Sequence, residues 1–149
     1  MPGIIVGIDG SSHSRRALDW AINEAVIRRA PLTVLTVQQV MRSFWAGPMI
    51  HPEDAELAEH ARKIAKDETD DAVSKFAEDA RPSEVTVLAV PGLPAEAILD
   101  VARDADMIVV GSRGAGGFKK LLMGSVAAQV THHAHIPVVV IPAEESSLQ

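Results

Sequence analysis

Cysteine is absent from the 149-residue chain, which excludes disulfide bonds, thiolate catalysis and cysteine-based zinc sites. No stretch of eighteen apolar residues occurs, so the sequence predicts no membrane-spanning helix. Residues 1–10 also lack the basic segment and apolar run of a secretory signal, and we therefore expect a cytoplasmic protein.

The chain has few aromatic residues and no cluster of basic ones. Its net charge of −6 arises in residues 53–84, which hold eleven of the 20 acidic residues but five of the 14 basic ones. Without a basic stripe to contact phosphates, we expect no nucleic-acid binding. Two of the five aromatic residues, Phe44 and Trp45, fall in the irregular segment 39–51. Such a loop is typical of a lid or contact surface, or of a flap packed on its own domain.

Short apolar segments rich in β-branched residues alternate with segments of helical periodicity. The strands are predicted at residues 4–8, 32–37, 84–90, 107–111 and 136–141, and the helices at 11–30, 52–80, 94–105 and 124–133. This alternation predicts one α/β domain over residues 1–149, with a mainly parallel sheet and helices on both faces.

Glycine and serine gather after the first and fourth predicted strands, in "IDGSSHS" (8–14) and "VGSRGAGG" (110–117). Parallel sheets bind ligands beyond the carboxyl ends of neighbouring strands, so these two loops would flank one crevice if their strands are adjacent. Neither standard phosphate motif fits, because Gly7 and Gly10 do not match a dinucleotide fingerprint and no lysine stands at the P-loop spacing.

The glycines after the fourth strand have a distinctive spacing. Gly111 and Gly114 are separated by two residues, and nine more precede Gly124 and Ser125 at the start of the last predicted helix. The glycines allow backbone N–H groups to approach an anion, and a helix N-terminus adds free N–H groups and a positive dipole end. The alternative is a strand-to-helix turn without a ligand.

The G-x2-G-x9-G-S spacing, within "MIVVGSRGAGGFKKLLMGSVAAQVTHHAHIPVVVI" (107–141), resembles the signature of the universal stress protein family. "IIVGIDGSSHSRRALDWA" (4–21) resembles the opening strand and helix of that family, and "VPGLPAEAIL" (90–99) its third connection. The resemblance covers nearly the whole chain. It implies a three-layer, Rossmann-like fold whose five-stranded parallel sheet has the order 3-2-1-4-5, with the first and fourth strands adjacent.

The resemblance also implies a ligand, ATP or a related adenine nucleotide (ADP or AMP) with Mg²⁺. Asp9 would lie near the ribose or a phosphate-bound Mg²⁺, and Val37 would present its backbone to the adenine. The remaining implied site residues line the ribose and phosphates: Ser11, Gly111, Ser112, Arg113, Gly114, Gly124, Ser125 and Val126. Binding members often carry a second hydroxyl where this chain has Ala127, which leaves the preference for ATP over ADP, AMP or cAMP open.

These features favour an adenine-nucleotide-binding regulatory protein with absent or slow turnover. Members of the family often form homodimers through the last strand, and the resemblance implies an interface at residues 138–141, Val138, Val139, Val140 and Ile141. Two other functions stay open: a slow ATPase or autophosphorylating enzyme, and a nucleotide-independent interaction protein acting through segment 39–51.

A histidine cluster lies between the last helix and the last strand, at His132, His133 and His135. Because cations are favoured at a helix C-terminus, we interpret it as a capping feature rather than a metal site.

Overall fold

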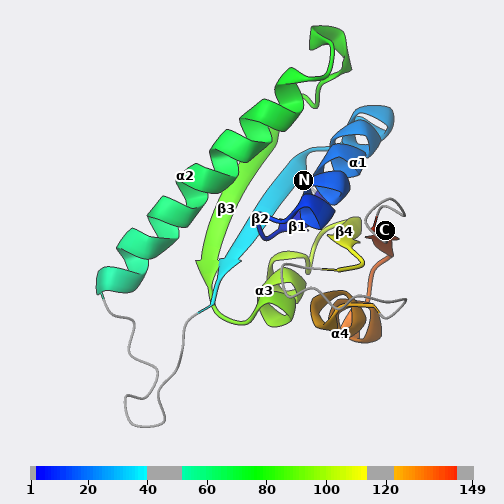
Figure 1. Cartoon of the computed structure of the whole chain (residues 1–149). Coiled ribbons are helices and arrows are strands. Elements are labelled where there is room, and N and C mark those ends of the chain that lie inside the picture. The colour runs from blue at the N-terminus through cyan, green and yellow to red at the C-terminus, as the bar shows by residue number, and fades with distance from the viewer. Residues whose placement is uncertain (1–2, 40–51, 114–122, 144–149) are drawn as a thin grey trace, which may run out of the picture.

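The computed structural model describes residues 3–39, 52–113 and 123–143 (Figure 1). Segment 40–51, Gly114 and the lysines at 119 and 120 lie outside these ranges. Along the chain the elements are β1 (Ile4–Ile8), α1 (Ser12–Arg28), β2 (Leu32–Gln38), α2 (Pro52–Ser74), a 3₁₀ turn (Glu78–Ala80), β3 (Val85–Pro91), α3 (Pro94–Val101), β4 (Met107–Gly111), α4 (Ser125–His133) and β5 (Val138–Ile141).

The five strands form one parallel sheet of order β3-β2-β1-β4-β5, which confirms the predicted fold. β1 pairs with β2 from Ile4–Leu32 to Ile8–Thr36, and with β4 from Ile4–Met107 to Val6–Val109. The strands that precede the two glycine-bearing loops are therefore neighbours. β3 and β5 form the two edges of the sheet.

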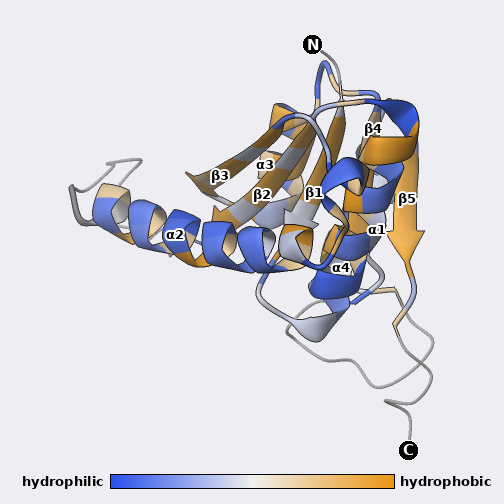
Figure 2. Ribbon diagram, turned by 90° about the horizontal axis from the view of Figure 1, so that it is seen from above, coloured by the Kyte–Doolittle hydropathy of each residue, from blue (hydrophilic) through white to orange (hydrophobic). Residues whose placement is uncertain are grey.

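Each face of the sheet is covered by two helices, because side chains alternate between the faces along a strand. Ile4 and Val6 of β1 belong to the core cluster that includes Leu18 of α1 and Ala65 of α2. Ile5 belongs to a second cluster, with α3 and α4. Figure 2 shows the hydrophobic strands between these layers, with α2 largely hydrophilic along its length.

The second helix is shorter than predicted, because α2 ends at Ser74 rather than at residue 80. The Arg81 side chain donates hydrogen bonds to the carbonyl oxygens of Phe76 and Ser74, at 3.0 and 3.3 Å, and so ties down the chain after the helix. Thr69 lies in the middle of this helix and is buried, and its hydroxyl donates to the carbonyl oxygen of Ala65 at 2.7 Å.

The other boundaries differ little from the prediction. α3 ends at Val101, before the predicted end at residue 105, and β5 begins at Val138, two residues after the predicted start. Pro137 lies just before β5 and has no N–H to donate to a ladder. Within the described ranges, no helix is both long and apolar enough to cross a membrane.

Candidate functional site

A cavity of about 490 Å³ opens beyond the carboxyl ends of β1, β2 and β4, where α3 and α4 begin. Its walls come from Gly7, Ile8, Asp9, Ser14, Leu35, Thr36, Val37, Gln39, Pro94, Ile98, Val110, Gly111, Ser112, Arg113, Gly124, Ser125, Val126 and Ala127. β1 lies in the centre, and the connections after β1 and β4 leave toward opposite faces. This is the position at which open α/β sheets bind ligands.

Most of the site residues inferred from the sequence line this cavity. Eight do so: Asp9, Val37, Gly111, Ser112, Arg113, Gly124, Ser125 and Val126. Ser11 is described but does not line the cavity, and Gly114 lies outside the described residues. Ala127 is buried and lines the cavity, so the position that lacks the expected hydroxyl faces the same space.

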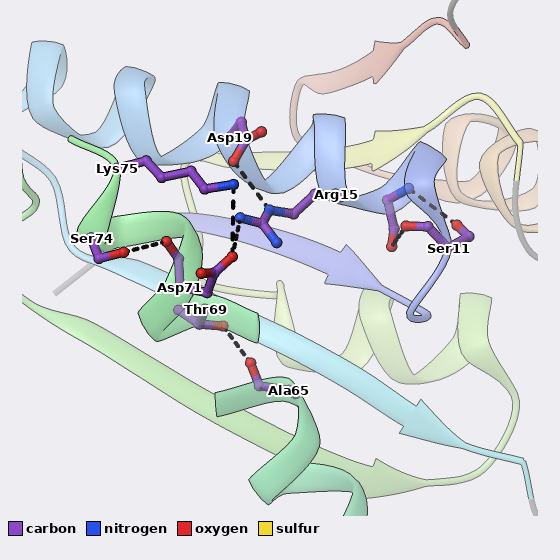
Figure 3. A network of polar contacts seen from close by, with 9 residues as sticks. Ser11, Arg15, Asp19, Ala65, Thr69, Asp71, Ser74 and Lys75 are labelled. Carbon is purple, nitrogen blue, oxygen red and sulfur yellow. Dashed lines mark hydrogen bonds and ion pairs between the residues drawn. The ribbon is translucent and has the colours of Figure 1, made fainter. Parts of the chain in front are cut away.

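The turn between β1 and α1 holds Asp9 at the rim of the cavity. Gly10 has a φ of +82°, a conformation that favours glycine and turns the chain into the helix. Ser11 is the N-cap of α1, as Figure 3 shows, and its Oγ accepts the N–H of Ser14 at 3.2 Å. The Asp9 carboxylate accepts hydrogen bonds from the N–H of Ser11, at 2.9 Å, and from its hydroxyl.

The side chain of Ser14 stabilises this turn, a role that was not predicted from the sequence. The side chain is buried, and its Oγ accepts the N–H of Asp9 at 3.2 Å while donating to the carbonyl oxygen of Ser11 at 3.1 Å. The sequence signal for this role is a serine three residues after the N-cap serine. That signal does not show that Ser14 is buried, because its burial depends on how α1 packs on the sheet.

The N-terminus of α4 forms the polar end of the cavity. The N–H of Gly124 donates to the carbonyl oxygen of Ser112 at 2.6 Å, and the N–H of Ser112 donates to Ile141 at 2.8 Å. The first bond holds the end of β4 against the start of α4, and the second continues the pairing of β4 with β5. The first hydrogen bond of α4 runs from Ala128 to Gly124, so the N–H groups of residues 125–127 precede it. Such N–H groups, together with the helix dipole, attract anions.

Gly111 lies where β4 approaches the start of α1 closely. A Cβ at this position would lie 3.1 Å from the carbonyl oxygen of His13 and 3.2 Å from that of Arg113. Both neighbours are backbone atoms, so they cannot move aside as the end of a side chain can. The glycine therefore allows β4, the start of α1 and the following loop to meet at the cavity.

The opposite end of the cavity is apolar and lies on β2 and α3. Leu35 and Ile98 are buried there, and Val37 packs against the same core cluster. In β2 the backbone N–H and carbonyl groups of even-numbered residues point toward β3. Two hydrogen bonds show this: the N–H of Leu32 donates to the carbonyl oxygen of Glu84, and the carbonyl oxygen of Gln38 accepts the N–H of Gly92. The carbonyl of Val37 therefore points toward β1. The last register pair between β1 and β2 is Ile8–Thr36, so this carbonyl lies beyond the paired part of β1, at the cavity.

A polar network links α1 to α2 beside the Asp9 turn (Figure 3). Arg15 donates to Asp71 at 2.8 Å and to Asp19 at 3.4 Å, and the hydrogen bond from Arg15 lowers the pKa of Asp71. Burial raises the pKa of Glu68, with smaller raising contributions from Asp9 and Asp19 and a lowering one from Arg15. The carboxylate at the cavity rim is therefore electrostatically coupled to α2.

The histidine cluster lies away from the cavity lining. His132 and His133 occupy the last turn of α4, with their rings in edge-to-face contact at a centroid distance of 4.8 Å. Among the described residues, no group of three potential ligands gathers around a metal position. A positive charge is favoured at this end of a helix, and the capping role of the cluster stays a prediction.

Comparison with known proteins identifies the family. The family model described as "Universal stress protein family" matches residues 2–142. A universal stress protein of Mycobacterium tuberculosis is 32% identical over 144 residues, which cover 97% of this chain and 48% of that protein. One from Mycolicibacterium smegmatis is also 32% identical, over 149 residues covering 97% and 49%. The chain thus spans about half the length of these curated relatives.

Solved structures support the same conclusion. Universal stress protein UspA from Lactobacillus plantarum superposes with a TM-score of 0.76 at 28% identity, covering 94% of this chain and 97% of that one. A universal stress protein in complex with cAMP gives 0.64 at 26% identity, with 95% and 96% covered. The Archaeoglobus fulgidus protein in complex with dAMP also gives 0.64 at 26%, with 95% and 98% covered. The chain described here belongs to the universal stress protein family.

Proposed function

We propose that this protein binds an adenine nucleotide, ATP in particular, in the cavity at the carboxyl end of the sheet, and acts as a regulatory protein. One observation carries the proposal: a single cavity joins a helix N-terminus to an apolar wall. The helix N-terminus suits phosphates, and the apolar wall suits a planar base. Relatives of similar fold have been solved with cAMP and dAMP, which are both adenine nucleotides.

The size and spacing of the cavity agree with a nucleotide. Neighbouring strands lie about 4.8 Å apart, so β2 and β4, on either side of β1, are separated by roughly 10 Å. A base against Val37 would place its ribose above β1, near Asp9, and its phosphates at Gly111, Ser112 and α4. The Val37 carbonyl is a hydrogen-bond acceptor and would suit the amino group of adenine.

The phosphate end of the cavity also suits a magnesium-bound nucleotide. Asp9 contributes an exposed carboxylate, a ligand type that Mg²⁺ prefers. The metal would neutralise part of the phosphate charge, while Arg113 and the N–H groups of α4 would neutralise the rest. Removal of Mg²⁺ with EDTA should therefore weaken ATP binding in wild-type protein, and should have less effect in Asp9→Asn.

Binding without rapid turnover fits the chemistry of the lining. The described residues that line the cavity include one carboxylate, Asp9, and no histidine, and Asp9 already accepts two hydrogen bonds from Ser11. General-base catalysis would depend on that group alone. Incubation with labelled ATP should release ADP no faster than in a Ser125→Ala control, and labelling of the protein itself would contradict this part of the proposal.

Calorimetric titration with Mg-ATP tests the binding site. Wild-type protein should bind, whereas Gly124→Val should bind at least tenfold more weakly, because a branched side chain at the N-cap enters the phosphate end. Ala128→Val is the matched control, since Ala128 is exposed on the same helix and does not line the cavity. Absence of heat with wild-type protein up to millimolar ATP, or equal binding by both variants, would refute the assignment.

We also propose that two copies pair through β5. This strand is an edge of the sheet, and its residues Val138, Val139 and Val140 are half-buried. An apolar edge strand needs cover in solution. The curated relatives are about twice as long, which leaves room for two such units in one chain. Light scattering should show a dimer that Val140→Lys converts to monomer, whereas Thr86→Lys on the opposite edge should not. A monomeric wild-type protein at micromolar concentration would exclude the pairing.

A further inference from the structure

We propose that the side chain of Gln39 recognises the base of the bound nucleotide and favours adenine over guanine. This inference rests on the proposed nucleotide function and concerns a residue that was not predicted from the sequence. Gln39 immediately follows β2 and lines the cavity, with an exposed side chain at its rim.

The position of Gln39 follows from the alternation of β2. Leu35 and Val37 lie on the face of the sheet covered by α3 and α4, and Gln39 continues the same parity. Thr36, the other polar residue of this segment in the lining, shares its parity with Leu32 and Val34, which pack on the opposite face. Leu35 and Val37 form the apolar wall at β2, and Gln39 follows them at the same spacing of two residues. Among the described residues that line the cavity, Gln39 is thus the polar residue of the β2 segment that lies on the same face as this wall.

The end of β2 is held firmly enough to position that side chain. Gln38 and Pro91 form the last register pair with β3, and the N–H of Gly92 donates to the carbonyl oxygen of Gln38 at 2.9 Å. The backbone is therefore fixed one residue before Gln39. Two residues earlier, the Val37 carbonyl points toward the cavity, so a backbone acceptor and a side-chain amide flank the same space.

The chemistry of a carboxamide matches adenine. Glutamine presents an N–H donor and a carbonyl acceptor side by side, and adenine presents the complementary pair at N7 and N6. Guanine presents two acceptors, O6 and N7, so the same carboxamide can satisfy only one of them. The second N6 hydrogen would remain available to the Val37 carbonyl, which would instead face an acceptor in guanine.

The test compares three nucleotides, Mg-ATP, Mg-GTP and Mg-7-deaza-ATP, by calorimetry. The deaza analogue lacks the N7 acceptor. Wild-type protein should bind ATP about three- to tenfold more tightly than 7-deaza-ATP, as expected for one hydrogen bond. Gln39→Ala should lose this difference, binding ATP and 7-deaza-ATP alike, and should weaken GTP binding less than ATP binding, because the carboxamide makes one hydrogen bond to guanine and two to adenine.

Gln38→Ala is the matched control, because it removes the same side chain from the adjacent residue, whose parity belongs to the opposite face. It should retain the wild-type preferences. Gln39→Arg provides a second variant: its two donors suit O6 and N7 of guanine and should narrow the ratio of ATP to GTP affinity.

The outcomes separate this inference from the function on which it rests. If wild-type protein binds no ATP, the proposed function fails, and the base assignment fails with it. If wild-type protein binds ATP but Gln39→Ala keeps the preference over 7-deaza-ATP, the nucleotide function stands and the role of Gln39 is refuted. Equal losses in Gln38→Ala and Gln39→Ala would also refute it, because the effect would then come from the end of the strand.

Discussion

Replacing Gly111 by alanine provides a quantitative test of how the cavity is built. The new Cβ would lie 3.1 Å from the carbonyl oxygen of His13 and 3.3 Å from its carbonyl carbon. These atoms belong to the first turn of α1, so relief requires a shift of that helix relative to β4. Overpacking of this kind costs about 1–3 kcal/mol, which corresponds to a decrease of roughly 3–10 °C in Tm for a chain of this size.

Gly7→Ala provides the comparison, because it adds the same methyl group beside the same cavity. Its Cβ would lie 3.0 Å from Cδ1 of Ile98, the end of a side chain that can rotate. We expect a smaller cost, below about 1 kcal/mol. Thermal and urea unfolding of both variants measure the difference, and ATP titration of Gly111→Ala should show weakened binding as well. Equal stability of the two variants, or a more stable Gly111→Ala, would refute the reasoning from backbone contact.

Three further predictions concern neighbouring residues. Ser14→Ala removes the buried hydroxyl that accepts the Asp9 N–H and should lower the unfolding free energy by about 1–2 kcal/mol in urea denaturation. Folding raises the pKa of Glu68, because burial disfavours the charged carboxylate. The stability that this residue contributes is therefore present below its unfolded pKa and is lost as the pH rises through its pKa in the folded protein. Glu68→Gln should therefore stabilise the protein at neutral pH, with a gain that disappears below about pH 4 in a series of urea titrations. Ala127→Ser adds a hydroxyl to the cavity lining and should raise ATP affinity by about two- to tenfold in calorimetry, whereas unchanged affinity would show that this position does not reach the phosphates.

The fold was predictable because its strands carry their own signal. The β-branched runs at 4–8 and 107–111 mark β1 and β4 without error, and the other strands differ by at most two residues at either end. The end of α2 was not predictable in the same way. It depends on hydrogen bonds from Arg81, a residue beyond the helix whose contacts follow from tertiary folding.

The candidate site was predictable where glycine spacing marks it and not where packing creates it. Gly111 and Gly124 were found from their separation along the chain, and the structure brings them to one cavity. Ser14 was missed because a serine in the first turn of a helix is ordinarily exposed, and only the docking of α1 buries it. Gln39 was missed because the strand was predicted to end at residue 37, so its alternation was not extended as far as residue 39, whereas β2 continues to Gln38.

Amide chemical shifts of ¹⁵N-labelled protein test most directly whether an adenine nucleotide binds between the apolar wall at β2 and the N-terminus of α4. On titration with Mg-ATP, the largest shifts should appear at the amides of residues 124–127, with further shifts at Ser112 and Val37. Residues at the other end of the sheet, such as Glu84 and Asp104, should remain unchanged. Shifts centred on those residues, or no shifts at millimolar ATP, would contradict the account.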